Sequence, residues 1–339
     1  MPPTIAVVAA GEMGAALGAR LVSVGRCTVY TVLAGRSQAT IDRAHKAGLL
    51  DIPLADLPAR AEWVLSVLPP IDAHSFAKSF LQARSQTTGE IATRVFVDCN
   101  AVSPATVRNI SSLFAGAGVS FLDACIIGGP PSEDYDPTIY ASADAADEKH
   151  LDAFERFNEL GLKVRALCGE SGDENGGIGD ASALKMSYAG IAKGVTGLLS
   201  TMILSAHAAS PRTASALLTE LSLSQPMLLK RAGAGIPPMI SKAYRWVGEM
   251  EEIADFVDSG LVSSPSSASH VGGSAKENGA EMGKEGGKTP GEIYRGLAAL
   301  YALVEGELTR NGREAGDVRT LLDFAGEAKR KSDSKTVSR

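Results

Sequence analysis

Short runs of apolar, β-branched residues alternate with helix-length segments through the first half of the chain. A strand at Thr4–Ala10 leads into a helix at Glu12–Val24. Strands separated by helices indicate βαβ units, so we expect an α/β domain with a doubly wound, mostly parallel sheet covered on both faces. Further strands are predicted at Cys27–Leu33, Trp63–Leu68, Val95–Asp98, Val119–Asp123, Thr138–Ala143 and Lys163–Leu167, the last two flanking a helix at Glu148–Leu160.

After Gly169 the pattern changes to helices alone, so we expect an all-α C-terminal domain. Ser182–Ala209 is apolar almost all round, which is typical of a buried helix. Its glycines, Gly190, Gly194 and Gly197, would let a neighbouring backbone approach closely. Other helices are predicted at Pro211–Leu223, Ser224–Gly233, Pro237–Gly260 and Gly291–Arg310.

These patterns predict the domain boundaries. We expect an α/β domain at residues 1–169, an interdomain helix within 170–210 and a helical domain at 211–327. Residues 259–290 are rich in Ser, Gly, Lys and Glu, and we expect a disordered insert that acts as an inert tether rather than a regulatory element. The polar, charged tail at 328–339 is also expected to be disordered.

Composition narrows the possible partners and compartment. The 339 residues carry a formal charge of −6, which argues against nucleic-acid binding and against a basic membrane patch. Four scattered cysteines indicate buried reduced thiols and no metal site. No apolar run approaches the ~20 residues that span a bilayer, and no signal peptide is recognised. We therefore expect a cytoplasmic protein without a membrane or nucleic-acid partner.

A glycine loop joins the first predicted strand to the first helix. Ala9-Ala10-Gly11-Glu12-Met13-Gly14 matches the GxGxxG fingerprint, with Ala9 in place of the first glycine. Gly11 lets a pyrophosphate approach the helix N-terminus, and Gly14 lets the helix pack closely on the sheet. Strand, loop and helix together predict a Rossmann domain whose cofactor contacts Gly11, Glu12, Met13 and Gly14.

The end of the second strand indicates which dinucleotide is bound. An NAD enzyme would place Asp or Glu there, but the strand ends in Ala34-Gly35-Arg36-Ser37. Arg36 has the chemistry to pair with a 2′-phosphate, and Ser37 to donate a second hydrogen bond. We predict NADP(H), the alternative being that Arg36 is a solvated loop residue.

Five blocks, taken in order, resemble the β-hydroxyacid dehydrogenase superfamily, which includes 6-phosphogluconate and 3-hydroxyisobutyrate dehydrogenases. The resemblance covers roughly residues 4–205. It implies a Rossmann domain, an interdomain helix and a helical domain that forms a homodimer. Beyond it, residues 242–253 resemble a C-terminal domain of poorly characterised fungal and bacterial proteins. The five blocks are Gly11–Gly14, Ser66–Pro70, Asp98–Pro104, Phe121–Pro130 and Gly179–Met186.

The resemblance also implies site residues, of which Lys185 is the catalytic one. Lys185 lies near the start of a helix almost free of charge, where a lysine can act as general acid or base. Periodicity alone would favour a helix-end lysine that reaches water. The other implied residues are Leu68, Pro69 and Asn100 at the cofactor, and Ala101, Ile127, Gly128, Gly129, Tyr188 and Ala189 at the substrate.

Three of these positions depart from the family pattern. Ala101, Ile127 and Ala189 stand where the family has Thr, Ser and Asn, so the usual cradle for a substrate carboxylate is missing. We therefore expect a bulkier or less acidic substrate. Tyr188 lies three residues after Lys185 on the same helix face and is a candidate to replace the lost Asn.

A second group of charged residues has two open interpretations. Arg245, Glu249 and Glu252 share one helix face. They form either an intrahelical salt-bridge ladder or a surface that faces the substrate.

These expectations lead to a function with two alternatives. The sequence predicts an NADP-dependent oxidoreductase that acts on a carbonyl or alcohol substrate, with Lys185 as acid/base. One alternative is an imine reductase on the same scaffold, although such enzymes usually replace the lysine. The other is a catalytically silent NADPH-binding sensor or scaffold.

Overall fold

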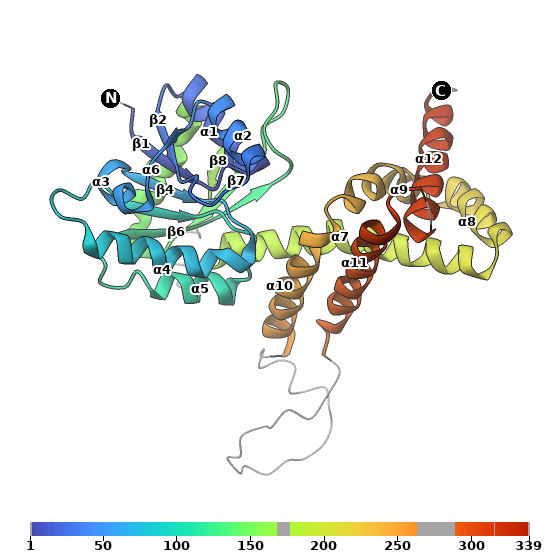
Figure 1. Cartoon of the computed structure of the whole chain (residues 1–339). Helices are drawn as coiled ribbons and strands as arrows, with labels where there is room; N and C mark the ends of the chain where they lie inside the picture. The colour runs from blue at the N-terminus through green and yellow to red at the C-terminus, as the bar shows by residue number, and fades with distance from the viewer. Residues whose placement is uncertain (1, 168–176, 263–288, 315, 338–339) are drawn as a thin grey trace, which may run out of the picture. The chain divides into compact units, whose positions relative to one another are not determined.

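The computed structural model describes residues 2–167, 177–262, 289–314 and 316–337 (Figure 1). The chain divides into two compact units, Met1–Tyr188 and Ala189–Arg339. Each unit is described separately below.

The first unit is built on one eight-stranded sheet. Its strand order is β3-β2-β1-β4-β5-β6-β7-β8, and all neighbours are parallel except β6 and β7. The predicted mostly parallel, doubly wound sheet is therefore confirmed. Strand β3 was not predicted, because two exposed residues leave no periodic signal. The strands are β1 (Thr4–Val8), β2 (Thr28–Thr31), β3 (Leu50–Asp51), β4 (Trp63–Ser66), β5 (Val95–Asp98), β6 (Ser120–Ile127), β7 (Thr138–Ser142) and β8 (Val164–Ala166).

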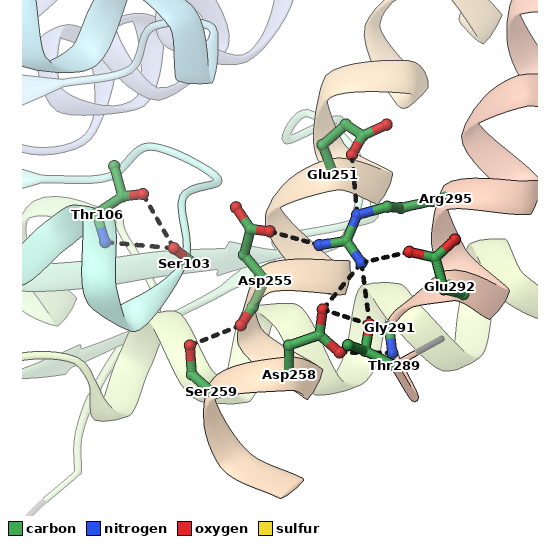
Figure 2. A network of polar contacts seen from close by, with 10 residues as sticks. All are labelled: Ser103, Thr106, Glu251, Asp255, Asp258, Ser259, Thr289, Gly291, Glu292 and Arg295. Carbon is green, nitrogen blue, oxygen red and sulfur yellow. Dashed lines mark hydrogen bonds and ion pairs between the residues drawn. The ribbon is translucent and has the colours of Figure 1, made fainter. Parts of the chain in front are cut away.

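Helices cover both faces of this sheet (Figure 1). Ile5 and Val7 point into a core with Leu17 and Leu21 of α1, whereas alternate β1 residues join the core of the other face. This alternation follows from the two-residue side-chain period of a strand. Ser103 caps α5 by accepting a hydrogen bond from the Thr106 amide at 3.2 Å (Figure 2). The helices are α1 (Glu12–Ser23), α2 (Gln38–Lys46), α3 (Leu57–Arg60), α4 (Pro70–Gln86), α5 (Pro104–Ser112) and α6 (Glu148–Glu155).

The second unit is helical, as predicted. Helix α7 (Asp180–Ala209) starts in the first unit and continues into the second. In the second unit, α9 packs on α12 and α10 packs on α11. The elements after α7 are α8 (Pro211–Ser224), α9 (Pro226–Ile240), α10 (Ala243–Val262), α11 (Glu292–Asn311) and α12 (Gly316–Val337).

Two helix predictions need correction. The tail expected to be disordered from 328 continues α12 to Val337, because Val318, Leu321 and Ala328 form one buried helical face. Helix α9 runs to Ile240 through two prolines, since burial of Ile236 and Ile240 holds its last turn against the core.

The predicted insert at 259–290 begins within α10, and its last two residues, 289 and 290, lie just before the start of α11. Its first residues continue α10 to Val262, and 263–288 lie outside the described residues.

A polar cluster joins the facing ends of α10 and α11. Asp258 accepts hydrogen bonds from the Gly291 amide at 2.7 Å, Thr289 Oγ1 at 2.9 Å and Arg295 Nη1 at 2.8 Å (Figure 2). Arg295 Nη2 also donates to Asp255 at 2.9 Å. We call Asp258, Thr289, Gly291 and Arg295 the Asp258 cluster.

Side chains of α11 lie beside the glycines of α7. A Cβ at Gly197 would lie 2.8 Å from side-chain atoms of both Leu297 and Tyr301 of α11, so these side chains would have to shift for any larger residue. A Cβ at Gly194 would lie 3.6 Å from the nearest α11 atom, which is an ordinary contact distance, so the predicted close approach of a neighbouring backbone stays a prediction.

By length and composition alone, helix α7 is long and apolar enough to cross a membrane, with a mean hydropathy of 1.3 over 18 of its residues. The sequence predicts no membrane-spanning segment, and a single helix of this kind is weak evidence against that prediction, because core helices of soluble proteins reach the same length and hydropathy.

Three of the four cysteines, Cys27, Cys99 and Cys125, are buried free thiols, as predicted. Cys168 lies outside the described residues.

Candidate functional site

The glycine loop lies where β1 turns into α1. Gly11 is the residue before the helix, and a Cβ at this position would meet nothing within 4 Å. A Cβ at Gly14 would overlap the Ala9 carbonyl oxygen, so glycine is required for the helix to approach the strand. No side chain among the described residues caps α1, so its first amides remain for an anion.

Beside this loop is a hollow of about 250 Å³ at the carboxyl edge of the sheet. It lies where the chain order reverses between β1 and β4, the position at which doubly wound sheets bind ligands. Its lining residues are Val8, Val32, Ala34, Arg36, Leu54, Leu68, Asp72, Ser75, Phe76 and Ser79.

Arg36 lines this hollow, after β2, and Ser37 is the next residue along the chain. Gly35 adopts a left-handed φ of 74°, and the Arg36 amide donates to the Leu33 carbonyl at 3.0 Å, which closes the turn. Ser37 precedes the first residue of α2, and both Arg36 and Ser37 are exposed. A guanidinium, a hydroxyl and a helix N-terminus therefore occur together.

Asn100 holds two strand ends together. Its Oδ1 accepts from the Leu68 amide at 2.6 Å, and its Nδ2 donates to Ser66 Oγ at 3.0 Å. Asn100 is 2% exposed, so its side chain braces the turn carrying Leu68 and Pro69. The predicted cofactor contact of Asn100 stays a prediction.

Lys185 lies at the same edge of the sheet. Strand β6 continues past β5, whose last residue Asp98 pairs with Asp123. The Lys185 Nζ donates to the Ile126 carbonyl on this extension, at 2.7 Å. Burial raises the pKa of the neighbouring Cys125 to about 12, while the charge on Lys185 acts to lower it.

The predicted substrate residues have different environments. Ala101 and Ile127 are half-buried, and Gly128 and Gly129 are exposed. Gly128 has a φ of 127°, and a Cβ there would overlap the Tyr135 hydroxyl.

The two candidates on α7 differ in exposure. Tyr188 is 52% exposed, whereas Ala189 is 4% exposed and belongs to the second unit. Their roles at the substrate stay predictions.

The Arg245 face is not a simple ladder. Buried Glu249 pairs with Lys193 of α7, whose Nζ lies 5.1 Å from the centre of the Trp246 ring. The ladder interpretation is therefore wrong at Glu249, because a lysine on another helix takes this carboxylate. A substrate role for Arg245 stays a prediction.

Sequence reasoning missed two parts of the site. One face of α4 lines the hollow, and the spacing of Asp72, Ser75, Phe76 and Ser79 was the available signal. The other part is a buried polar group beneath Lys185, described below. Asp123, Ser142 and Ser182 form this group and are distant in sequence, so no local sequence pattern predicts it.

Two sequence families match parts of this chain. Residues 4–166 match the NAD binding domain of 6-phosphogluconate dehydrogenase. Residues 208–304 match a domain of unknown function, DUF1932. No curated protein sequence matches the chain.

Solved structures resemble the chain over most of its length. MTH1747, a conserved protein of unknown function described as similar to 3-hydroxyacid dehydrogenases, is 26% identical, with 89% of this chain and 99% of that chain covered and a TM-score of 0.55. A conserved hypothetical protein from Sinorhizobium meliloti 1021 is 20% identical, covers 97% of each chain and has a TM-score of 0.58.

A third similar structure is a 3-hydroxyisobutyrate dehydrogenase from Salmonella typhimurium. It is 13% identical, with 94% of this chain and 98% of that chain covered and a TM-score of 0.53. At such identities the last two structures show the fold alone. The chain thus joins a Rossmann-type NAD-binding domain of the 6-phosphogluconate dehydrogenase kind to a helical C-terminal region that contains the DUF1932 match.

Proposed function

We propose that this chain is an NADP(H)-dependent oxidoreductase that transfers hydride to or from a carbonyl or alcohol carbon, with Lys185 as general acid/base. The observation that carries the proposal is the Lys185 amino group on the Ile126 carbonyl. It lies at the carboxyl edge of the sheet, where β1 leads into the loop of Gly11 and where Arg36 lines the hollow. The match of residues 4–166 to an NAD binding domain supports the cofactor class.

The residues present fit a phosphorylated dinucleotide. The uncapped start of α1 and the open space at Gly11 suit a pyrophosphate. Arg36 and Ser37 suit a 2′-phosphate, since charge-assisted hydrogen bonds are strong and geometrically specific. When bound, the nicotinamide ring supplies or accepts the hydride.

Lys185 handles the proton that accompanies this transfer. In reduction its ammonium group donates a proton to the substrate oxygen, and in oxidation the neutral amine removes the hydroxyl proton. The Ile126 carbonyl keeps the amino group at the strand end between turnovers. Because Lys185 itself donates or accepts the proton, this step requires no metal ion.

The substrate is a bulkier and less acidic carbonyl compound or alcohol than 3-hydroxyisobutyrate. Ala101 and Ile127 offer apolar surface where the resembled family offers hydroxyls. Burying a carboxylate against such groups without a hydrogen bond is costly.

A test of Lys185 follows NADPH absorbance with panels of aldehydes, keto acids and cyclic imines. We expect turnover with apolar carbonyls, and Lys185→Met lowers kcat by about 10²–10⁴-fold, the usual contribution of a general acid/base. Lys230→Met, an exposed lysine of the helical unit, serves as control and keeps kcat. Full turnover by Lys185→Met contradicts the mechanism; turnover of imines alone favours an imine reductase, and tight NADPH binding without turnover favours a sensor.

A test of Arg36 compares Kd values for NADPH and NADH by fluorescence titration. Loss of a charged hydrogen-bond donor costs about 1.5–3 kcal/mol, so Arg36→Leu weakens NADPH binding by about 10–100-fold and leaves NADH binding nearly unchanged. Lys46→Leu removes a positive charge from the other end of α2 and leaves both constants in place. Equal losses for NADPH and NADH would contradict a 2′-phosphate contact.

A further inference from the structure

The start of α7 is fixed by buried side chains of the sheet. Asp123 Oδ2 accepts hydrogen bonds from the amides of Gly179 and Ser182, both at 3.0 Å, and Asp123 Oδ1 accepts from Ser182 Oγ at 2.7 Å. Ser142 Oγ accepts from the Ala181 amide at 3.1 Å and donates to Asp123 Oδ2 at 3.4 Å. We call Asp123, Ser142 and Ser182 the α7 cap; all three are at most 1% exposed.

The chemistry of the α7 cap suits a carboxylate and not an amide. A helix N-terminus leaves its first amides without partners and carries partial positive charge. Every group that contacts Asp123 donates to it, so both carboxylate oxygens act as acceptors. Burial raises the pKa of Asp123, and the hydrogen bonds from Ser182, Gly179 and Ser142 oppose that rise.

The same two elements hold Lys185. Lys185 follows Ser182 by three residues on α7, and Ile126 follows Asp123 by three residues on β6. The hydrogen bond from Lys185 to Ile126 therefore lies one helical turn and one short strand segment beyond the α7 cap. A shift of the first turn of α7 along β6 would move the Lys185 amino group away from the Ile126 carbonyl.

We infer that Asp123, acting through Ser182 and Ser142, is a positioning residue that sets where the Lys185 amino group lies. This inference rests on the proposed function of Lys185 for its catalytic consequence, although not for its geometry. Titratable groups near the α7 cap are Asp98 on β5, Cys99 after it, Cys125 on β6 and Lys185 itself. Two further charged groups contact the residue before Gly179: Arg108 donates to the Ile178 carbonyl at 3.0 Å, and Asp144 accepts from the Ile178 amide at 3.1 Å.

The primary test replaces the capping hydroxyl. In Ser182→Ala we expect kcat to fall about tenfold or more while the Kd for NADPH changes less than about twofold, since positioning acts on the chemical step. Ser182→Thr retains the hydroxyl and restores most of the lost kcat. The matched control is Ser210→Ala, which removes the hydroxyl that caps α8 at 3.0 Å and leaves kcat unchanged. Asp123→Asn is the more severe variant, because its NH2 group faces other donors.

A second readout does not depend on turnover. Acetylation of Lys185 by an amine-reactive ester, quantified by mass spectrometry at pH 7.5, reports whether its amino group has left Ile126. We expect labelling to rise at least about threefold in Ser182→Ala and Asp123→Asn, because the hydrogen bond that holds the Lys185 amino group on Ile126 is weakened, and not in Ser210→Ala. Unchanged labelling, or a kcat loss that Ser182→Thr fails to restore, overturns the inference. Turnover that survives Lys185→Met overturns the proposed function instead, and the labelling result still decides the positioning role.

Discussion

Asp98 is the residue whose environment most plainly affects stability. It is 1% exposed at the end of β5, and its Oδ2 has no hydrogen-bond partner among the described residues. Burial raises its pKa to about 7, and the nearby Asp123 carboxylate acts in the same direction. In the folded protein the Asp98 side chain is therefore largely protonated below pH 7.

This environment predicts a pH-dependent stability. The folded state binds the Asp98 proton more tightly than the unfolded state does, so stability falls as pH rises from about 4 to about 7 and then levels off. Between pH 5 and pH 7 the loss is about 2–3 kcal/mol at 1.36 kcal/mol for each pKa unit. Asp98→Asn is neutral at every pH and lacks this contribution.

Urea unfolding of wild type and Asp98→Asn at pH 5, 6, 7 and 8 measures the difference directly. The amide places an unpaired N–H where Asp98 has its unpaired oxygen, but that cost is the same at every pH. Only the change with pH is diagnostic. Parallel stability profiles for the two proteins would contradict the protonated state of Asp98.

Residues of the site differ in how far sequence could predict them. Gly11 and Gly14 were predictable because their roles depend on a strand, a turn and a helix that are adjacent in sequence. The α7 cap was not, because Asp123, Ser142 and Ser182 meet only through strand pairing and the return of α7 to the sheet. The cofactor contact predicted for Asn100 stays a prediction, while the hydrogen bond from the Leu68 amide to its side chain could be found only in the structure.

At the scale of elements, periodic apolar patterns predicted most strands and helices of the chain. The failures have a common cause in tertiary contacts. β3 exists because Leu50 and Asp51 pair with β2, and α12 extends because one of its faces is buried. Local composition suggested neither, since paired edges and buried faces are supplied by distant parts of the chain.

The Asp258 cluster is the polar contact between α10 and the start of α11 that we expect to contribute to the free energy of unfolding. Asp258→Ala removes the acceptor of three hydrogen bonds between α10 and the start of α11, so we expect a loss of about 1–3 kcal/mol. Burial acts to raise the pKa of Asp258, but the hydrogen bonds from Arg295, Gly291 and Thr289 lower it overall. The loss should therefore be full at neutral pH and shrink as pH falls below about 4.

Glu251→Gln is the matched control for this cluster. Glu251 is half exposed and lies 3.8 Å from Arg295, so we expect a change below about 0.5 kcal/mol. Trp246 is in the helical unit and Trp63 is in the sheet unit. Urea unfolding followed by Trp246 fluorescence in a Trp63→Phe background thus reports the helical unit. Equal losses in the free energy of unfolding for Asp258→Ala and Glu251→Gln would contradict the expected larger contribution of Asp258.

At the scale of the whole molecule, sequence alone predicted a Rossmann domain followed by helices, and both are present. The sequence could predict this order because the fold class depends on the succession of strand and helix patterns along the chain. That succession does not change when the ends of individual elements are predicted a few residues away from their true positions. Association with other chains depends instead on which apolar residues remain exposed after folding. This information appears only in the structure.

Helix α7 keeps such an exposed surface within the helical unit. Ile191, Leu198 and Met202 are 70%, 59% and 49% exposed, and together with Val195 they follow alternating steps of three and four residues. This spacing forms a continuous apolar stripe along one side of a helix and suits packing against another helix. We propose that it contributes to the homodimer expected from the sequence, a second copy of the chain supplying the covering surface.

Light scattering coupled to gel filtration tests this proposal by measuring mass. We expect wild type to have twice the 35.1 kDa of one chain at micromolar concentration, and Leu198→Glu to have the mass of one chain, because a carboxylate buried in an apolar contact loses its hydration. His207→Glu places the same charge on an exposed position of α7 outside the stripe, so this variant remains dimeric. A monomeric wild type, or a dimer that tolerates Leu198→Glu, shows that the stripe does not mediate association.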